Sequence, residues 1–398
     1  MTDTSAAPAH CFVPYPAPPG GTPHAAAGPL SGLCFAIKDI YDVAGYPTGC
    51  GNPHVLALSG IKPASAPVVD SLLAAGAAFV GKVVTDELAF SMNGKNAHFG
   101  APRNGAAPDR ITGGSSSGSA SAVSNGLADF AIGSDTGGSV RAPASHCGLI
   151  GLRPTHERIS LAGCMPLSPG FDTCGWFARD IATFARVGQV LLGEDSAPLP
   201  LRPRWLVAAD VLGLLDPAVQ ALFSATLDRL ALVLGTPTPV QATGGIAFDT
   251  LYWAFRHLQG VQAWQSQGAT IERYGLQLGP GVADRFAWAR DVAPTNIATH
   301  SAVQRDLRQR LHTLLGEDGV LLLPSMPQVA PLLAESEASL DDYRNRAIRM
   351  LCLAGLSGCP QLSLPLMSID GVPLGFSLIG PPGSDQSLIA LAAQLLES

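Results

Sequence analysis

The chain has 398 residues and a formal net charge of −7, with 47% hydrophobic and only 14% charged residues. Soluble domains usually carry about 25% charged residues, so much of this chain must be buried, as in a large sheet covered on both faces. Nucleic-acid binding needs a basic stripe, which the sequence lacks, so we expect no nucleic-acid partner. No apolar run reaches the roughly 18 residues of a membrane span, so we expect no membrane partner either.

The cysteines and the first residues predict the compartment. The first ten residues contain no basic stretch followed by an apolar one, so we expect no signal peptide. The eight cysteines are scattered, without a CxxC pair. This favours reduced thiols, a cytoplasmic location and the absence of a metal site. The cysteines are Cys11, Cys34, Cys50, Cys147, Cys164, Cys174, Cys352 and Cys359.

Residues 1–28 are rich in Pro, Ala and Gly and predict an irregular N-terminal arm. Apolar runs and their breakers predict the elements that follow. In chain order they are a strand over 33–40, a helix over 67–78, a strand over 77–84, a small-residue helix over 117–128 and an apolar strand from residue 128 that runs into a Gly-rich turn. In the second part they are helices over 178–192 and 217–234, a strand over 320–327, a helix over 340–356, strand pieces over 361–366 and 374–380, and a last helix over 385–396.

Alternating strands and helices predict an α/β fold with layers of helices and sheet. No repeat or long linker forces a domain boundary, so we expect a single large domain over residues 29–398. The segment 252–288 differs from the rest because it holds seven aromatic residues. They are Tyr252, Trp253, Phe255, Trp264, Tyr274, Phe286 and Trp288. This segment is either a hydrophobic helical core or the lining of a pocket for an apolar or aryl substrate.

Two Gly/Ser loops, over 113–119 and 133–141, carry the strongest chemical signal. In the second, Thr136-Gly137-Gly138-Ser139 can offer a hydroxyl nucleophile at the end of a turn whose backbone N–H groups converge on a developing oxyanion. Such a site suits hydrolysis of an amide. Asp135 and Arg141 flank the turn, and we expect them to form an ion pair that supports it.

The base that would activate this serine is less evident. His146 is the one histidine near the loop, and an ordinary packed role suits it better. Only four of the 24 basic residues are lysines, and a buried lysine can act as a base when it is neutral. Lys62 and Lys95 lie in polar loops. The apolar surroundings of Lys38 favour it, and Lys82 remains a rival on these grounds.

The motifs GGSSSGSASAV and GSDTGGSVRAPASHCGLIGLRPT resemble the signature of the amidase signature family. Further segments that look like the family extend the resemblance over roughly residues 28–396, except for a poorly matching part at about 195–315. The resemblance implies a central mixed β-sheet covered by helices on both faces. It also implies a catalytic triad in which Ser139 is the nucleophile, Ser115 the proton shuttle and Lys38 the base. The cis peptide of the family is expected between Gly114 and Ser115.

The resemblance further implies an oxyanion hole made by the backbone amides of Thr136, Gly137, Gly138 and Ser139, and no cofactor. Two other motifs are set aside. Residues 114–118 fit G-x-S-x-G, but no apolar strand precedes them, and no phosphate-binding glycine motif occurs.

We therefore expect an amidase that hydrolyses a small carboxylic amide to a carboxylate and ammonia through an acyl-Ser139 intermediate. The stretches 86–104 and 171–180 look most like short indole-3-acetamide hydrolases, which suggests an aryl or indole acyl group. Two alternatives stay open: an amidotransferase subunit that delivers ammonia to a partner chain, and a non-catalytic scaffold of the same fold. The amidase could form a homodimer, and the sequence does not decide its oligomeric state.

Overall fold

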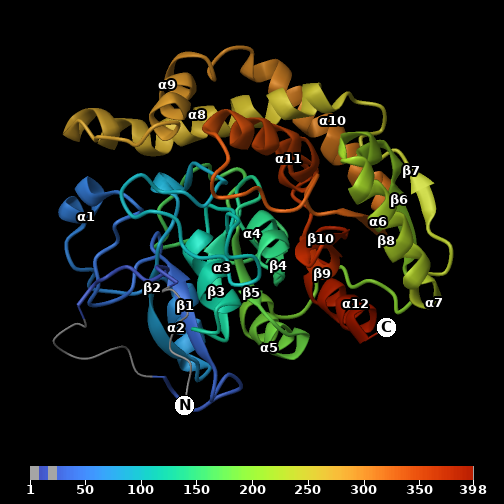
Figure 1. The fold of residues 1–398 in the computed structure, drawn as a ribbon, viewed down its shortest axis with the longest axis horizontal. Helices are drawn as coiled ribbons and strands as arrows, with labels where there is room; N and C mark the ends of the chain where they lie inside the picture. The colour runs from blue at the N-terminus through green and yellow to red at the C-terminus, as the bar shows by residue number, and fades with distance from the viewer. Residues whose placement is uncertain (1–8, 17–24, 398) are drawn as a thin grey trace.

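The computed structural model describes residues 9–16 and 25–397 (Figure 1). The expected arm over residues 1–28 lies largely outside them, so its boundary at residue 28 stays a prediction.

A mixed ten-stranded sheet forms the centre of the described chain, with the strand order β2-β1-β3-β5-β4-β9-β10-β8-β6-β7. Strand β1 pairs in parallel with β2 and β3, and β6 pairs in parallel with β7 and β8, whereas the remaining neighbours are antiparallel. The strands are β1 (Cys34–Lys38), β2 (Ala78–Val83), β3 (Phe130–Ser134), β4 (Ile150–Arg153), β5 (Cys174–Ala178), β6 (Arg204–Ala208), β7 (Thr238–Val240), β8 (Gly319–Pro324), β9 (Gln361–Ile369) and β10 (Val372–Ile379).

Helices cover both faces of this sheet, as predicted. Along β1, Phe35 and Ile37 belong to the larger hydrophobic cluster, while Ala36 between them belongs to a second cluster. Because successive side chains of a strand point to opposite faces, the two clusters lie on opposite sides of the sheet at β1. Helices α2 (Pro67–Ala74), α5 (Ile181–Leu192) and α12 (Asp385–Glu397) contribute to the first cluster, and α3 (Ser117–Ser124) contributes to the second.

A layer of long helices lies over one end of the sheet, at the top of Figure 1. It contains the aromatic-rich segment as α8 (Phe248–Tyr274) and α9 (Val282–Asp291), in contact with α10 (Ile297–Leu315) and α11 (Glu337–Ser357). Phe255 and Phe286 are buried, whereas Trp253 and Tyr274 are close to half exposed. The segment is therefore helical, and only part of its aromatic surface is core.

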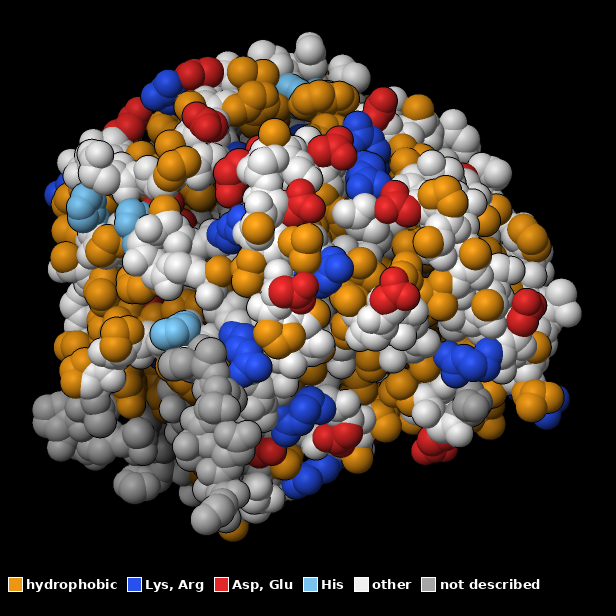
Figure 2. All heavy atoms as spheres, viewed as in Figure 1, with side chains coloured by type: hydrophobic (Ala, Val, Ile, Leu, Met, Phe, Trp, Pro, Cys, Tyr) orange, Lys and Arg blue, Asp and Glu red, His pale blue; other side chains and the backbone are white. Residues whose placement is uncertain are grey.

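The remaining elements are short or lie outside the site. They are α1 (Pro53–Ser59), α4 (Arg141–His146), α6 (Pro217–Arg229) and α7 (Ala231–Leu234), with 3₁₀ turns at Glu87–Ala89 and Ala209–Leu214. The helix predicted over 217–234 is thus two helices, because the chain leaves helical geometry at Leu230. Acidic and basic side chains are interspersed over the face seen in Figure 2. No helix of the described chain has both the length and the apolar character needed to cross a bilayer.

Candidate active site

The site lies at the carboxyl ends of two neighbouring parallel strands. Ile37 of β1 is in register with Ile132 of β3, so Lys38 and Ser134 follow at the same edge of the sheet. Their side chains meet there, with 2.9 Å between Lys38 Nζ and Ser134 Oγ. The two apolar segments form the paired strands β1 and β3, and this pairing places Lys38 beside the start of the second Gly/Ser loop.

Lys38 is completely buried, and its ammonium nitrogen also lies 2.6 Å from Ser115 Oγ. Burial lowers the pKa of Lys38 to about 8, although Asp86 and other nearby acidic groups work against this shift. A lysine with this pKa is neutral in about a tenth of the molecules at pH 7 and in about half at pH 8, and the neutral form can accept a proton.

Ser115 is buried two residues before the start of α3, and the peptide bond between Gly114 and Ser115 is cis, as predicted. The residues after it fasten this segment to β3. Ser116 Oγ donates to the carbonyl of Ser134 at 3.1 Å, and Ser119 Oγ donates to the carbonyl of Ile132 at 2.9 Å. Small side chains on α3 allow this close approach of helix and strand.

Ser139 ends the turn that follows β3 and is almost fully buried. The backbone N–H of Ser116 donates to its carbonyl oxygen at 3.4 Å, which joins the two Gly/Ser loops. No hydrogen bond links the hydroxyls of Ser115 and Ser139 within the described chain, so proton transfer between them stays a prediction. Gly138 has a φ of 127°, a conformation that glycine adopts readily, and a Cβ there would lie 2.4 Å from Leu351 Cδ1.

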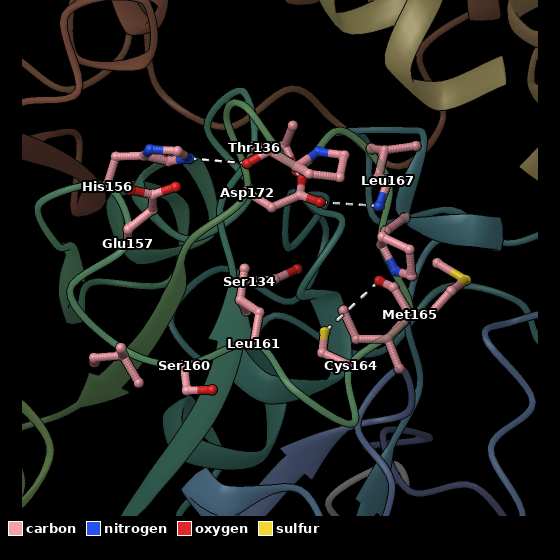
Figure 3. Close-up of a pocket in the computed structure, with 15 residues that line it drawn as sticks. Ser134, Thr136, His156, Glu157, Ser160, Leu161, Cys164, Met165, Leu167 and Asp172 are labelled. Atoms are coloured by element: carbon pink, nitrogen blue, oxygen red, sulfur yellow. Dashed lines mark hydrogen bonds between the residues drawn. The ribbon is translucent and has the colours of Figure 1, made fainter. Parts of the chain in front are cut away.

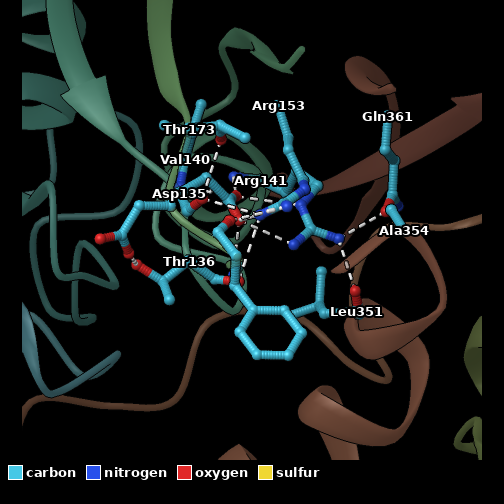
Figure 4. A network of polar contacts seen from close by, with 12 residues as sticks. Asp135, Thr136, Val140, Arg141, Arg153, Thr173, Leu351, Ala354 and Gln361 are labelled. Carbon is cyan, nitrogen blue, oxygen red and sulfur yellow. Dashed lines mark hydrogen bonds and ion pairs between the residues drawn. The ribbon is translucent and has the colours of Figure 1, made fainter. Parts of the chain in front are cut away.

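Asp135 organises the turn from within (Figure 4). Its carboxylate accepts from Arg141 Nη2 at 2.8 Å, from Arg153 Nη1 at 3.1 Å and from the Gly138 N–H at 2.9 Å. Burial alone would raise the pKa of Asp135, but the two guanidinium groups hold it well below its usual range. The expected ion pair with Arg141 is therefore present, and Arg153 extends it. Among the four amides predicted to form the oxyanion hole, that of Gly138 already has an acceptor.

The two rival bases have other partners. Lys82 is buried, but its ammonium pairs with Asp39 Oδ1 at 2.8 Å and donates to Thr48 Oγ1 at 2.9 Å. His146 is packed against Tyr343, with 2.6 Å between Nε2 and the phenolic oxygen. Burial lowers the pKa of His146 to about 3, so the ring is neutral at ordinary pH.

A cavity of about 300 Å³ opens beside Ser134 and Thr136, and the segment between β4 and β5 forms most of its wall. Figure 3 shows its labelled residues arranged around Ser134. The lining is mainly apolar and consists of Ile40, Ala89, Ser134, Thr136, His156, Glu157, Ile159, Ser160, Leu161, Cys164, Met165, Pro166, Leu167, Pro169 and Asp172. The side chain of Thr136 is held by its 2.5 Å hydrogen bond to Asp172 Oδ1.

A second, much smaller cavity of about 20 Å³ lies directly beside Ser139. It shares Thr136 with the larger cavity, and Phe255 of α8 and Arg344 of α11 also line it. One member of the aromatic segment therefore contributes to a cavity at the predicted nucleophile.

The sequence pattern alone did not identify Ser134 as a partner of Lys38. Its position inside the second Gly/Ser loop, at the end of an apolar strand parallel to β1, is the signal that would have found it. The described residues contain no group of three or more His, Cys, Asp or Glu side chains suited to hold a metal ion.

Comparisons with known proteins agree on one family. The family model described as Amidase matches residues 20–210 and 286–389. A curated protein named Amidase 1, from Arabidopsis thaliana, is 41% identical over 92% of this chain and 93% of its own length. A glutamyl-tRNA(Gln) amidotransferase subunit from Halobacterium salinarum is 31% identical over 93% of this chain and 96% of its own length. A solved structure described as "Crystal structure of amidase" superposes with a TM-score of 0.83 at 30% identity, covering 95% of this chain and 86% of that chain.

Proposed function

Since the chain belongs to the amidase family, and is expected to act on amides as that family does, we propose that it hydrolyses a small carboxylic amide with Lys38, Ser115 and Ser139 as its catalytic residues. The observation that carries the proposal is the 2.6 Å contact between the buried Lys38 ammonium nitrogen and Ser115 Oγ, beside the loop that ends in Ser139.

In the proposed reaction, Ser139 Oγ attacks the carbonyl carbon of the amide. Its proton passes to Ser115, while the proton of Ser115 passes to neutral Lys38. When the carbon–nitrogen bond breaks, the proton returns through Ser115 to the leaving nitrogen, and ammonia departs. Water then cleaves the acyl-Ser139 ester by the reverse relay, which releases the carboxylate and restores both hydroxyls.

The developing oxyanion needs converging N–H donors. The backbone amides of Thr136, Gly137 and Ser139 have no acceptor within the described chain, and the proposal therefore relies on these three. The Gly138 amide supports the turn through Asp135 instead. The asymmetry gives each glycine a separate role: Gly137 offers a donor, and Gly138 permits the turn.

The larger cavity supports an apolar acyl group, because most of its lining residues are apolar and it lies next to Thr136. A volume of about 300 Å³ accommodates a small ring system, which is consistent with the aryl or indole acyl group inferred from the resemblance. The eight cysteines are all unpaired, which supports the proposed cytoplasmic location.

The test is ammonia release from a panel of primary amides, comparing the wild-type protein with Ser139→Ala. The panel contains short aliphatic amides, malonamate, glutamine, benzamide and indole-3-acetamide. We expect release from at least one amide, reduced roughly 10⁴-fold or more in Ser139→Ala with an unchanged circular dichroism spectrum. Ser119→Ala is the matched control, because this buried hydroxyl only donates to a β3 carbonyl. Turnover near the wild-type level in Ser139→Ala would exclude this nucleophile.

The amidotransferase alternative rests on the 31% identity to the Halobacterium protein. It requires a stable partner chain that receives ammonia. Ammonia release only in the presence of a co-purifying chain would favour the amidotransferase over the proposed stand-alone hydrolase. A folded protein that releases no ammonia either with or without such a chain would favour the scaffold.

A further inference from the structure

The described chain buries three arginines at its site, and one of them differs from the others. Arg141 and Arg153 share Asp135, and both also donate to backbone carbonyls. Arg344 of α11 is only 5% exposed, yet no acidic side chain or carbonyl within the described chain accepts from its guanidinium. An arginine retains its charge inside a protein, so burying it without a partner is costly.

The surroundings of Arg344 add positive charge rather than neutralise it. Burial, Arg256 and Arg285 all push the pKa of Arg344 well below its usual range. Tyr252 and Asp341 oppose this shift. Asp341 lies one helical turn away and is exposed, and neither residue forms an ion pair or hydrogen bond with Arg344 in the described chain. The fold thus assembles a positive site with no anion of its own.

This positive site opens on the predicted nucleophile. Arg344, Ser139 and Gly137 line the same small cavity beneath α8 and α11. Gln259 of α8 lines it too, and its buried side-chain oxygen has no hydrogen-bond partner in the described chain. Two polar groups from different helices therefore face one cavity, and each lacks a partner.

The cavity is too small for a ring. Its volume of about 20 Å³ is close to the space of one water molecule, so it admits a small polar group at most. A carboxylate meets the charge requirement, because it supplies a negative charge to the guanidinium, and one of its oxygens is about the size of a water molecule. The larger, apolar cavity on the other side of Thr136 remains available for the bulk of a substrate.

We propose that Arg344 binds a carboxylate on the substrate, so that the preferred substrates are amides whose acyl group carries a carboxylate a few bonds from the scissile carbonyl. The proposal rests on the proposed amidase function. Arg344 is then a specificity-determining residue, because its guanidinium pairs with the substrate anion. A neutral amide leaves the guanidinium buried and unpaired.

The test compares amides of equal shape and different charge: succinamate against 4-methylpentanamide, and malonamate against 3-methylbutanamide. In each pair an isopropyl group replaces the carboxylate. We expect the wild-type protein to prefer the anionic member by about 10- to 100-fold in kcat/KM, the effect of a charged hydrogen bond. In Arg344→Met this ratio should fall to about one, and Arg344→Lys should restore part of it.

Arg346→Met is the matched control, since Arg346 lies on the same helix but pairs with Asp216 at 2.9 Å. It should keep the wild-type ratio. Equal kcat/KM values for both members of each pair in the wild-type protein would overturn the proposal. A ratio that survives in Arg344→Met would overturn it as well.

A binding measurement separates this inference from the proposed reaction. Calorimetry with Ser139→Ala should detect succinamate binding that is lost in Ser139→Ala/Arg344→Met, even where no amide is hydrolysed. Binding without turnover by the wild-type protein would contradict the amidase function and keep the carboxylate site. Turnover of neutral amides with no succinamate binding would keep the function and contradict the site.

Discussion

The hydroxyl of Ser134 offers a direct test of how Lys38 is tuned. In the proposed mechanism, only neutral Lys38 accepts a proton. With a pKa of about 8, kcat/KM should rise with pH, pass its midpoint near pH 8 and level off above it. Ser134 Oγ accepts from the ammonium at 2.9 Å and thereby favours the charged form.

Replacing Ser134 by alanine removes this acceptor. A hydrogen bond to a charged group contributes about 1.5–3 kcal/mol, and one pKa unit corresponds to about 1.4 kcal/mol. The pKa of Lys38 should therefore fall by about one to two units in Ser134→Ala. The midpoint of the profile should move from near pH 8 to about pH 6–7, so that a larger share of the protein is active at low pH.

The assay is ammonia release from the best amide of the panel, measured as kcat/KM between pH 5.5 and 10 at constant ionic strength. Ser119→Ala is the control, because its hydroxyl bonds Ile132 at 2.9 Å and leaves the contacts of Lys38 in place. A midpoint of Ser134→Ala that coincides with that of the wild type, or that lies at higher pH, would show that Ser134 does not favour the charged form of Lys38.

Three further substitutions test the framework of the site. Lys38→Met should abolish ammonia release and leave the melting temperature close to that of the wild type or higher. Lys82→Met should retain turnover at 25 °C but lower the free energy of unfolding by about 3–5 kcal/mol in urea titrations, because it leaves the buried Asp39 carboxylate without its cation. The opposite pattern of activities would make Lys82 the base. Asp135→Asn leaves the buried guanidinium groups of Arg141 and Arg153 without their negatively charged partner. We expect the free energy of unfolding to fall by about 3–5 kcal/mol in the same titration, and a fall below about 1 kcal/mol would contradict the role of this ion-pair network. Gly138→Ala should lower both the melting temperature and kcat, because its φ of 127° and the nearby Leu351 leave no room for a Cβ, and wild-type values for both would show that the turn adapts.

Local patterns predicted the site well where neighbouring residues act together. The Gly/Ser loops carry Ser115, Ser139 and the Asp135–Arg141 pair within short segments. The choice between Lys38 and Lys82 was harder, because both lie in apolar strands. The side chain of Asp39 distinguishes the two lysines. Because Asp39 directly follows Lys38, it points to the opposite face of the sheet and pairs with Lys82. A sequence does not reveal which of two buried lysines receives that carboxylate.

The fold was predicted where elements have a clear period or an apolar run. The strands at 33–40 and 77–84 and the last helix correspond to β1, β2 and α12. Short strands such as β4, with four residues, were not predicted, because so few residues show no period. Arg344 and Gln259 were also missed. They come from two helices far apart in the chain, and only tertiary packing brings them to one cavity.

The anchoring of Arg141 has a consequence for how the enzyme is made. Its guanidinium donates to the carbonyl of Leu351 at 2.8 Å and to Gln361 Oε1 at 2.5 Å, residues that follow it by 210 and 220 positions. During translation, the predicted nucleophile leaves the ribosome long before these acceptors exist. A nascent chain that ends before α11 therefore carries Ser139 and Asp135 without these two acceptors of Arg141, and we expect hydrolytic activity only once β9 has been synthesised and has entered the sheet.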